Sequence, residues 1–198
     1  MFSSNSRRKK ASSYSKSSNY SKSSSYANKS GYEKPAELSE SELRVAAINL
    51  LSRREYSRHE LYQKLSPRTS SESHVEQLLN RLEEAGYQSD QRFAESFLRS
   101  RINRGLGRMR IERELKDKGI DHYLIEELLA ADIDWFELAY ECGLKKSQSL
   151  DFAEYKDKQK LFRYLAYRGF SMDQIQYAIE QYQNNLSITN RSNKKSIY

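Results

Sequence analysis

The chemistry that this sequence offers is positive charge concentrated in one short stretch. Eight lysines or arginines and only three acids lie between residues 99 and 118 of the 198-residue chain. Glycines at 105 and 107 interrupt the stretch, which predicts the end of one helix, a tight turn and the start of another. Guanidinium and ammonium groups bind phosphates and carboxylates. A helical hinge this basic therefore indicates a polyanion or an acidic protein as its partner.

The acids on the same helix decide which of these bases are free to bind. Arg108, Arg110 and Arg113 each have an acid four residues on, the spacing of helix-stabilising ion pairs. Their charge can serve the helix alone, so both interpretations stay open. Arg101 and Arg104 lie three residues apart on one face, and neither has an acid three or four residues away. We expect these two arginines to be uncompensated within the chain and offset by an external anion.

An internal repeat extends the set of candidate bases. A shift of 50 residues places Arg54 on Arg104, and Arg58 on Arg108 and Lys158. A base at the same place in successive units forms a line, which suits a rod-like polyanion or the groove of a filament. The candidate binding residues are therefore Arg101, Arg104, Arg54, Arg58, Arg108, Arg110, Arg113 and Lys158.

A search for catalytic chemistry gives nothing comparable. The three histidines are scattered, and none has a second His or a Cys at metal-ligand spacing. Cys142, the single cysteine, has no nearby histidine and is interpreted as a core residue. The Gly105–Gly107 pair lacks the preceding strand and the further Gly and Lys of a phosphate loop. We predict no enzyme activity, no metal and no cofactor.

The elements that position the bases follow from the same repeat. Adding 50 and then 100 to five apolar positions (61, 65, 75, 78 and 79) gives ten positions that are all apolar. The connector Gly119-Ile120-Asp121 recurs as Gly169-Phe170-Ser171, a left-handed helix stop followed by a cap. A period near 50 residues indicates a helical repeat array. We predict an all-α fold of three three-helix repeats, at 38–88, 89–132 and 133–183, that form a curved, elongated molecule.

Capping residues and helix breakers set the expected helix ends. Ser39 and Ser57 each have a glutamate three residues on, so both begin capping boxes. Pro67 ends the helix that Ser57 begins. The other expected boundaries are a first helix that ends near Glu55, a third helix at 73–85, a cap at Asp90, a helix at 124–131, a cap at Asp134, an insertion at 143–152 with helix again from about 153, and a last helix from Ser171 to about Tyr182.

Most of the net charge of +7 belongs to the two ends of the chain. Residues 1–37 carry +6 and residues 184–198 carry +3, so the sequence between them carries −2. Both ends are predicted to be disordered tails. Tyrosines recur every six residues at 14, 20, 26 and 32. They mark either a basic tail with no defined site or rings that stack on unpaired bases while lysines follow the phosphates; we favour the former.

Composition narrows the setting of the protein. A single cysteine excludes a disulfide framework and suits a reducing compartment. No apolar run approaches the roughly 18 residues of a membrane span. The basic N-terminus has no apolar segment behind it that would make a signal peptide. We therefore expect a cytoplasmic protein that does not bind membranes.

A resemblance to the RecX family of regulatory proteins is carried by four segments: LLSRREYSRHEL at 50–61, GYQSDQRFA at 86–94, SRINRGLG at 100–107 and KLFRYLAYRGFS at 160–171. The resemblance covers about residues 40–182. It implies three three-helix repeats and a protein that binds RecA recombinase filaments on DNA. It further implies that the protein limits recombinase ATP hydrolysis and strand exchange, with effects on recombination and DNA repair. Relatives often have proline where this chain has Arg108, whereas Arg101 and Arg104 match the family's motif.

Two functions are carried forward. The first is a monomeric regulator that docks in the groove of the RecA filament through the repeat core, with DNA as a further partner. The second is a stand-alone, non-sequence-specific DNA-binding protein that uses the tyrosine- and lysine-rich tail and the line of arginines. Inhibition of the recombinase at substoichiometric amounts favours the first, and an effect only when DNA is saturated favours the second.

Overall fold

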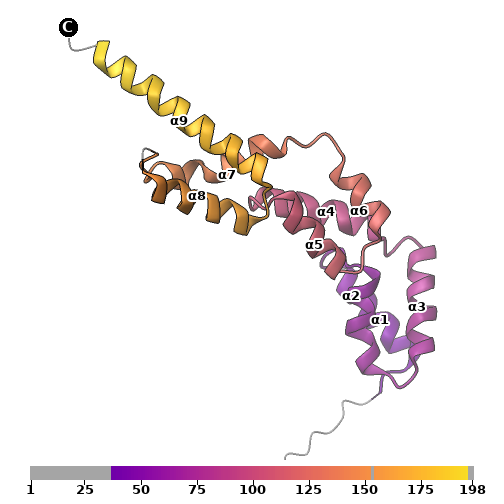
Figure 1. Cartoon of the computed structure of the whole chain (residues 1–198). Coiled ribbons are helices and arrows are strands. Elements are labelled where there is room, and N and C mark those ends of the chain that lie inside the picture. The colour runs from indigo at the N-terminus through magenta and orange to yellow at the C-terminus, as the bar shows by residue number, and fades with distance from the viewer. Residues whose placement is uncertain (1–36, 153, 196–198) are drawn as a thin grey trace, which may run out of the picture. The chain divides into compact units, whose positions relative to one another are not determined.

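The computed structural model describes residues 37–152 and 154–195, and within these ranges the chain is helical, with no strand. The expected all-α fold is confirmed. The tyrosine-repeat segment lies outside the described residues. The helices, labelled in Figure 1, are α1 (Glu40–Leu51), α2 (Arg58–Leu65), a 3₁₀ turn η1 (Ser66–Arg68), α3 (Glu72–Glu84), α4 (Asp90–Asn103), α5 (Arg108–Asp117), α6 (His122–Leu129), α7 (Trp135–Ser147), α8 (Tyr155–Arg168) and α9 (Met172–Lys195).

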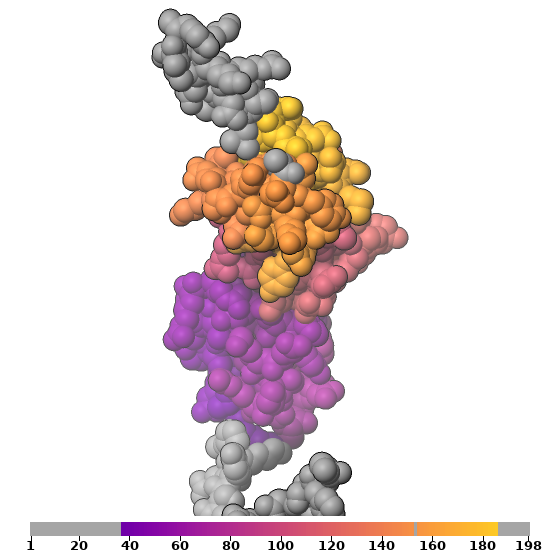
Figure 2. All heavy atoms as spheres, turned by 60° about the vertical axis from the view of Figure 1, so that its left-hand side comes forward, coloured from indigo at the N-terminus to yellow at the C-terminus, as the bar shows by residue number. Residues whose placement is uncertain are grey.

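Each successive group of three helices surrounds its own apolar core. In the space-filling view, the first group, coloured indigo to purple, forms one continuous mass (Figure 2). The three cores are centred on Leu43, Leu61 and Val75 in α1–α3, on Phe93, Ile111 and Ile125 in α4–α6, and on Ala139, Leu161 and Ile175 in α7–α9. Helix α7 joins two of them, because Trp135 packs in the second core whereas Ala139 packs in the third.

The 50-residue period corresponds to burial. All of the repeated apolar positions are buried except Leu128, which is partly buried. The connectors repeat as well: Gly119 and Gly169 have φ values of +73° and +92°. After each glycine, the next N–H bonds back to a carbonyl in the last turn, from Ile120 to Leu115 and from Phe170 to Leu165, both at 3.2 Å. This is the Schellman pattern that the sequence predicts.

Several helix ends differ from those expected. Helix α1 ends at Leu51, four residues before Glu55, and α7 continues through part of the expected insertion to Ser147. Helix α9 continues past Tyr182 to Lys195, so residues 184–195 extend a helix where a tail is expected. No proline or glycine lies between 183 and 195 to end it.

The start of α4 is also corrected. Ser89, not Asp90, is the N-cap, and its hydroxyl accepts from the Arg92 N–H. Asp90 instead accepts a hydrogen bond from the backbone N–H of Arg58, at 2.8 Å. The carboxylate that the sequence assigns to a local cap therefore connects the second repeat to the first.

Candidate functional site

The middle helices of successive repeats meet end to end. At the first junction, the Ser57 hydroxyl, which caps the start of α2, donates to the carbonyl of Lys118 at the end of α5, at 2.8 Å. At the second junction, the N–H of Gly107 at the start of α5 donates to the carbonyl of Arg168 at the end of α8, at 2.9 Å. The two contacts are related by the same shift of 50 residues.

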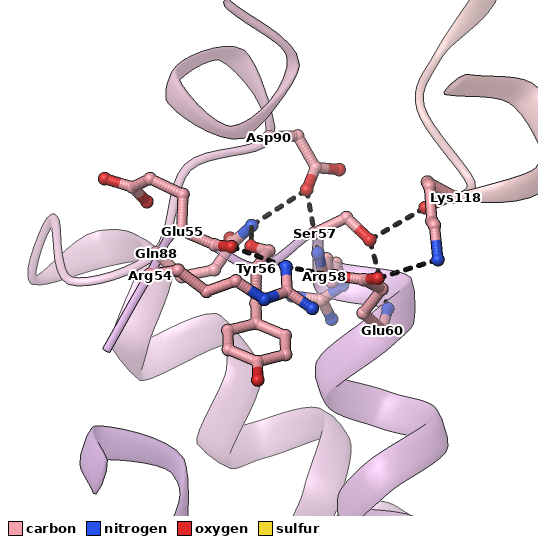
Figure 3. A network of polar contacts seen from close by, with 9 residues as sticks. All are labelled: Arg54, Glu55, Tyr56, Ser57, Arg58, Glu60, Gln88, Asp90 and Lys118. Carbon is pink, nitrogen blue, oxygen red and sulfur yellow. Dashed lines mark hydrogen bonds and ion pairs between the residues drawn. The ribbon is translucent and has the colours of Figure 1, made fainter. Parts of the chain in front are cut away.

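One buried carboxylate holds the first junction together. Glu60, 8% exposed, lies between the Arg54 guanidinium at 2.9 Å and the Lys118 ammonium at 2.8 Å, as Figure 3 shows. Burial alone would raise the pKa of this carboxyl, but the hydrogen bonds from Arg54 and Lys118 outweigh it and hold the pKa below its usual range. Glu60 therefore stays ionised and fixes both cations in place.

The same cations line a cleft at this junction. The cleft has a volume of about 340 Å³, and its walls come from the loop before α2, from α4 and from the end of α5. We call it the basic cleft. Four of its lining residues are cations and two are acids: Arg54, Arg101, Arg104 and Lys118, with Glu55 and Glu60. Aromatic rings and hydroxyls complete the lining, from Phe93, Phe97, Ser96 and Ser100. An anion in this cleft would meet a net positive wall.

The two arginines expected to be uncompensated prove to be unlike each other. Arg101 forms an ion pair with Glu114, Nε to Oε2 at 2.6 Å, and its guanidinium lies 4.1 Å from the centre of the Phe97 ring. The expectation for Arg101 was wrong because its partner is on the next helix, 13 residues away. Arg104 is exposed, and its side chain makes no ion pair or hydrogen bond to any residue that the structure describes. Arg104 is thus the free cation of the basic cleft.

Arg58 and Arg108 are committed to their own repeats. Each begins a middle helix and pairs with the glutamate 18 residues on, on the third helix of the same repeat. The Arg58–Glu76 distance is 2.6 Å and the Arg108–Glu126 distance is 3.3 Å. These bases do repeat by 50 residues, but the repetition serves packing within each unit.

The remaining candidates lie outside the basic cleft. Arg110 pairs with Glu114 at 3.0 Å, so one carboxylate links it to Arg101. Arg113 lines a separate groove between α5, α8 and α9. Lys158 lies in a hollow between α8 and α9. The structure therefore brings Arg54, Arg101 and Arg104 together and does not form a single line of all eight bases.

The ion pairs expected along α5 are confirmed in part. Lys116 pairs with Glu112 at 2.5 Å, and Arg110 with Glu114. Lys118, expected to pair with Glu114, pairs with Glu60 in the first repeat instead. Lys118 is the cleft cation that sequence reasoning left out. Its signal was its place one residue before the repeated glycine, at the position that Arg168 holds in the next unit.

Other kinds of chemistry find little support in the described part of the chain. Among the described residues, no cluster of three or more His, Cys, Asp or Glu side chains could hold a metal ion. Cys142 donates to the Gly105 carbonyl at 3.3 Å, and burial raises the pKa of its thiol. No described helix is both long and apolar enough to cross a membrane.

Comparison with protein families gives three consecutive matches. Residues 44–82 match the family description "RecX, first three-helix domain", residues 89–129 match the second such domain and residues 132–179 the third. The matches coincide with the three groups of helices described above.

Individual relatives give the same result. The chain is 44% identical over 146 residues to the "Regulatory protein RecX" of Acinetobacter baylyi, covering 74% of this chain and 91% of the relative. It is 43% identical over 131 residues to the protein of that name from Legionella pneumophila, covering 66% and 87%. The crystal structure of RecX from Lactobacillus salivarius superposes with a TM-score of 0.63 at 27% identity, over 73% of this chain and 96% of that one.

Proposed function

Because the chain belongs to the RecX family of regulatory proteins, we propose that it binds RecA filaments on DNA and inhibits their ATPase and strand-exchange activities. In this proposal it acts by docking and catalyses no reaction itself. The observation that carries the proposal is the unbroken series of three RecX domains over residues 44–179.

The basic cleft is the proposed point of contact with the filament. A nucleoprotein filament presents phosphates and acidic side chains, and Arg104 is a cation with no partner among the described residues. Arg54, Arg101 and Lys118 are held beside it by Glu60 and Glu114. Cations already fixed in position lose less conformational freedom on binding than mobile ones do.

Recombinase ATPase on single-stranded DNA tests the proposal. The assay is run with and without the protein, at a salt concentration where the protein alone does not bind DNA. We expect inhibition when the protein is present at far fewer copies than the recombinase. If ATPase activity falls only when the protein saturates the DNA, the rival function holds, that of a stand-alone DNA-binding protein.

A further inference from the structure

The second junction carries a groove that the basic cleft does not explain. The groove has a volume of about 620 Å³. We call it the junction groove. It is lined by Met109, Arg110, Arg113 and Glu114 of α5, by Phe162, Ala166 and Tyr167 of α8, by the connector Gly169-Phe170-Ser171, and by Met172 and Ile175 of α9. Three of its large side chains are exposed, Met109 at 58%, Tyr167 at 78% and Met172 at 69%.

The first junction serves as an internal control for this feature. The two junctions share their end-to-end helix contacts, so a shift of 50 residues identifies equivalent positions. At those positions the first junction has polar residues: His59 for Met109, Lys116 for Ala166, Asp117 for Tyr167 and His122 for Met172. Packing of the repeats therefore does not require apolar residues here. Exposed methionine and aromatic side chains around a groove are typical of a surface that binds protein.

The charge of the junction groove is positive at one edge. Its one acidic lining residue, Glu114, accepts from both Arg101 and Arg110. Arg113 is exposed and makes no ion pair or hydrogen bond to the residues described. A segment that fills the groove would therefore gain most by presenting apolar side chains next to a carboxylate.

This charge argues against three other occupants. The N-terminal 36 residues carry eight bases and one acid, so they would bring like charge to Arg113. A symmetric dimer through this face would place Arg113 of each copy in the same interface. Nucleic acid would place phosphates against a lining that is largely apolar, and burying charge there is costly.

We propose that the junction groove binds a segment of the recombinase in which apolar side chains flank an acidic residue. This inference rests on the proposed function and adds to it a second contact, separate from the basic cleft. The filament would then be held by charge at the first junction and mainly by apolar contact at the second.

Site-directed crosslinking tests the occupant. Met172→p-benzoylphenylalanine in the full-length chain is irradiated with recombinase filaments on single-stranded DNA, and the crosslinked peptide is identified by mass spectrometry. Tyr123→p-benzoylphenylalanine, at an exposed site on α6, is the control. We expect Met172 to capture an acidic, apolar recombinase peptide that Tyr123 does not. Capture of DNA, of the protein's own chain or of a second copy, or no capture by a variant that still inhibits, would overturn the inference.

Charge reversal gives an independent readout. Arg113→Glu should raise the concentration needed for half-inhibition of the ATPase by roughly tenfold, the change that about 1.4 kcal/mol of lost affinity produces. Arg99→Glu, an exposed arginine on α4 outside both sites, should leave that concentration unchanged. Equal inhibition by the two variants would contradict the junction groove alone. Failure of the unmodified protein to inhibit would instead contradict the proposed function, and the inference with it.

Discussion

Glu60 shows how a single residue can set the geometry of a binding surface. Its carboxylate is nearly buried, yet it stays charged because Arg54 and Lys118 approach it from two repeats. The ion pairs thereby do two things at once. They join the repeats across the first junction, and they hold two cations at the wall of the basic cleft.

Removing this carboxylate should reduce stability in a pH-dependent way. Glu60→Gln should lower the free energy of unfolding by roughly 1.5–3 kcal/mol, the usual worth of hydrogen bonds to a charged group. Since the folded pKa of Glu60 is depressed, its contribution is present above the unfolded pKa of about 4.3 and is lost as the pH falls through the folded pKa. Urea unfolding at about pH 7 and about pH 3 measures the difference.

The control for this variant is Glu55→Gln. Glu55 pairs with Arg92 at 3.1 Å and is more exposed than Glu60, so we expect its loss to cost no more than about 1 kcal/mol. A gap between Glu60→Gln and the unmodified protein that persists undiminished at about pH 3 would show that the ion pairs do not provide the stability.

Arg104 and Arg101 should separate function from folding. Arg104→Glu changes an exposed side chain that is unpaired within the described residues, so its unfolding free energy should stay within about 0.5 kcal/mol of the unmodified value. Its inhibition of the recombinase should fall. Arg101→Glu places a second carboxylate against Glu114 and removes the contact with Phe97, so it should also lose stability. Thermal unfolding and the ATPase assay measure the two effects. Undiminished inhibition by Arg104→Glu would exclude the basic cleft as the contact.

At the scale of helices, the end-to-end contacts answer a problem that every helix has. The first N–H groups and the last C=O groups of a helix lack partners within it. At the second junction, the Gly107 and Met109 N–H groups at the start of α5 donate to the Arg168 and Gly169 carbonyls at the end of α8. The positive end of one helix dipole also meets the negative end of another. Each helix end thus completes its neighbour.

This contact needs glycine on both sides, for different reasons. A Cβ on Gly107 would lie 2.4 Å from the Gly169 carbonyl carbon, although its φ of −83° is ordinary for any residue. Gly107 was expected to provide freedom for the turn, but it provides space. A Cβ on Gly169 would lie 2.6 Å from the Arg110 backbone nitrogen, and its φ of +92° is strained for other residues as well.

Alanine substitutions should distinguish the two costs. Gly86, with a φ of +72° and nothing within 4 Å of an added Cβ, reports backbone strain alone. We expect Gly86→Ala to cost roughly 1 kcal/mol. Gly107→Ala should cost about 1–3 kcal/mol through the clash, and Gly169→Ala more than either, because it combines both effects. Differential scanning calorimetry would show the order. Equal midpoints for Gly86→Ala and Gly169→Ala would mean that the junction tolerates an added Cβ.

The sequence predicted those features that depend on neighbours in the chain. Buried faces recur by 50 residues, and the Schellman stops at Gly119 and Gly169 follow from local backbone rules. Contacts between helices were not predictable in this way. Arg101 finds Glu114 across a turn, and Ser57 finds Lys118 at a separation of 61 residues, where helix packing decides what is near. The basic cleft was therefore predicted by its residue types and missed in its internal pairing.

Over the whole molecule, charge is divided between the repeats and the N-terminal segment. Residues 1–36 hold eight bases and one acid, which leaves 26 bases and 26 acids in the rest of the chain. The repeats are nevertheless locally polar, since residues 99–118 are strongly basic while residues 119–141 contain seven acids and no lysine or arginine. Recognition by the repeats therefore depends on where charges lie, while attraction to any polyanion depends on the N-terminal segment.

Deleting that segment should separate these two properties. A fragment of residues 37–195 keeps every described helix and has no net formal charge. We expect it to keep its helical circular dichroism and its inhibition of the recombinase, because both belong to the repeats. Its affinity for naked single-stranded DNA should fall and depend less on salt, since each phosphate contact removed lowers the slope of log K against log salt by roughly 0.7. Titration of labelled oligonucleotide across a salt series measures that slope. A folded fragment that no longer inhibits, yet binds DNA as before, would place the regulatory contact in residues 1–36 and remove it from the basic cleft.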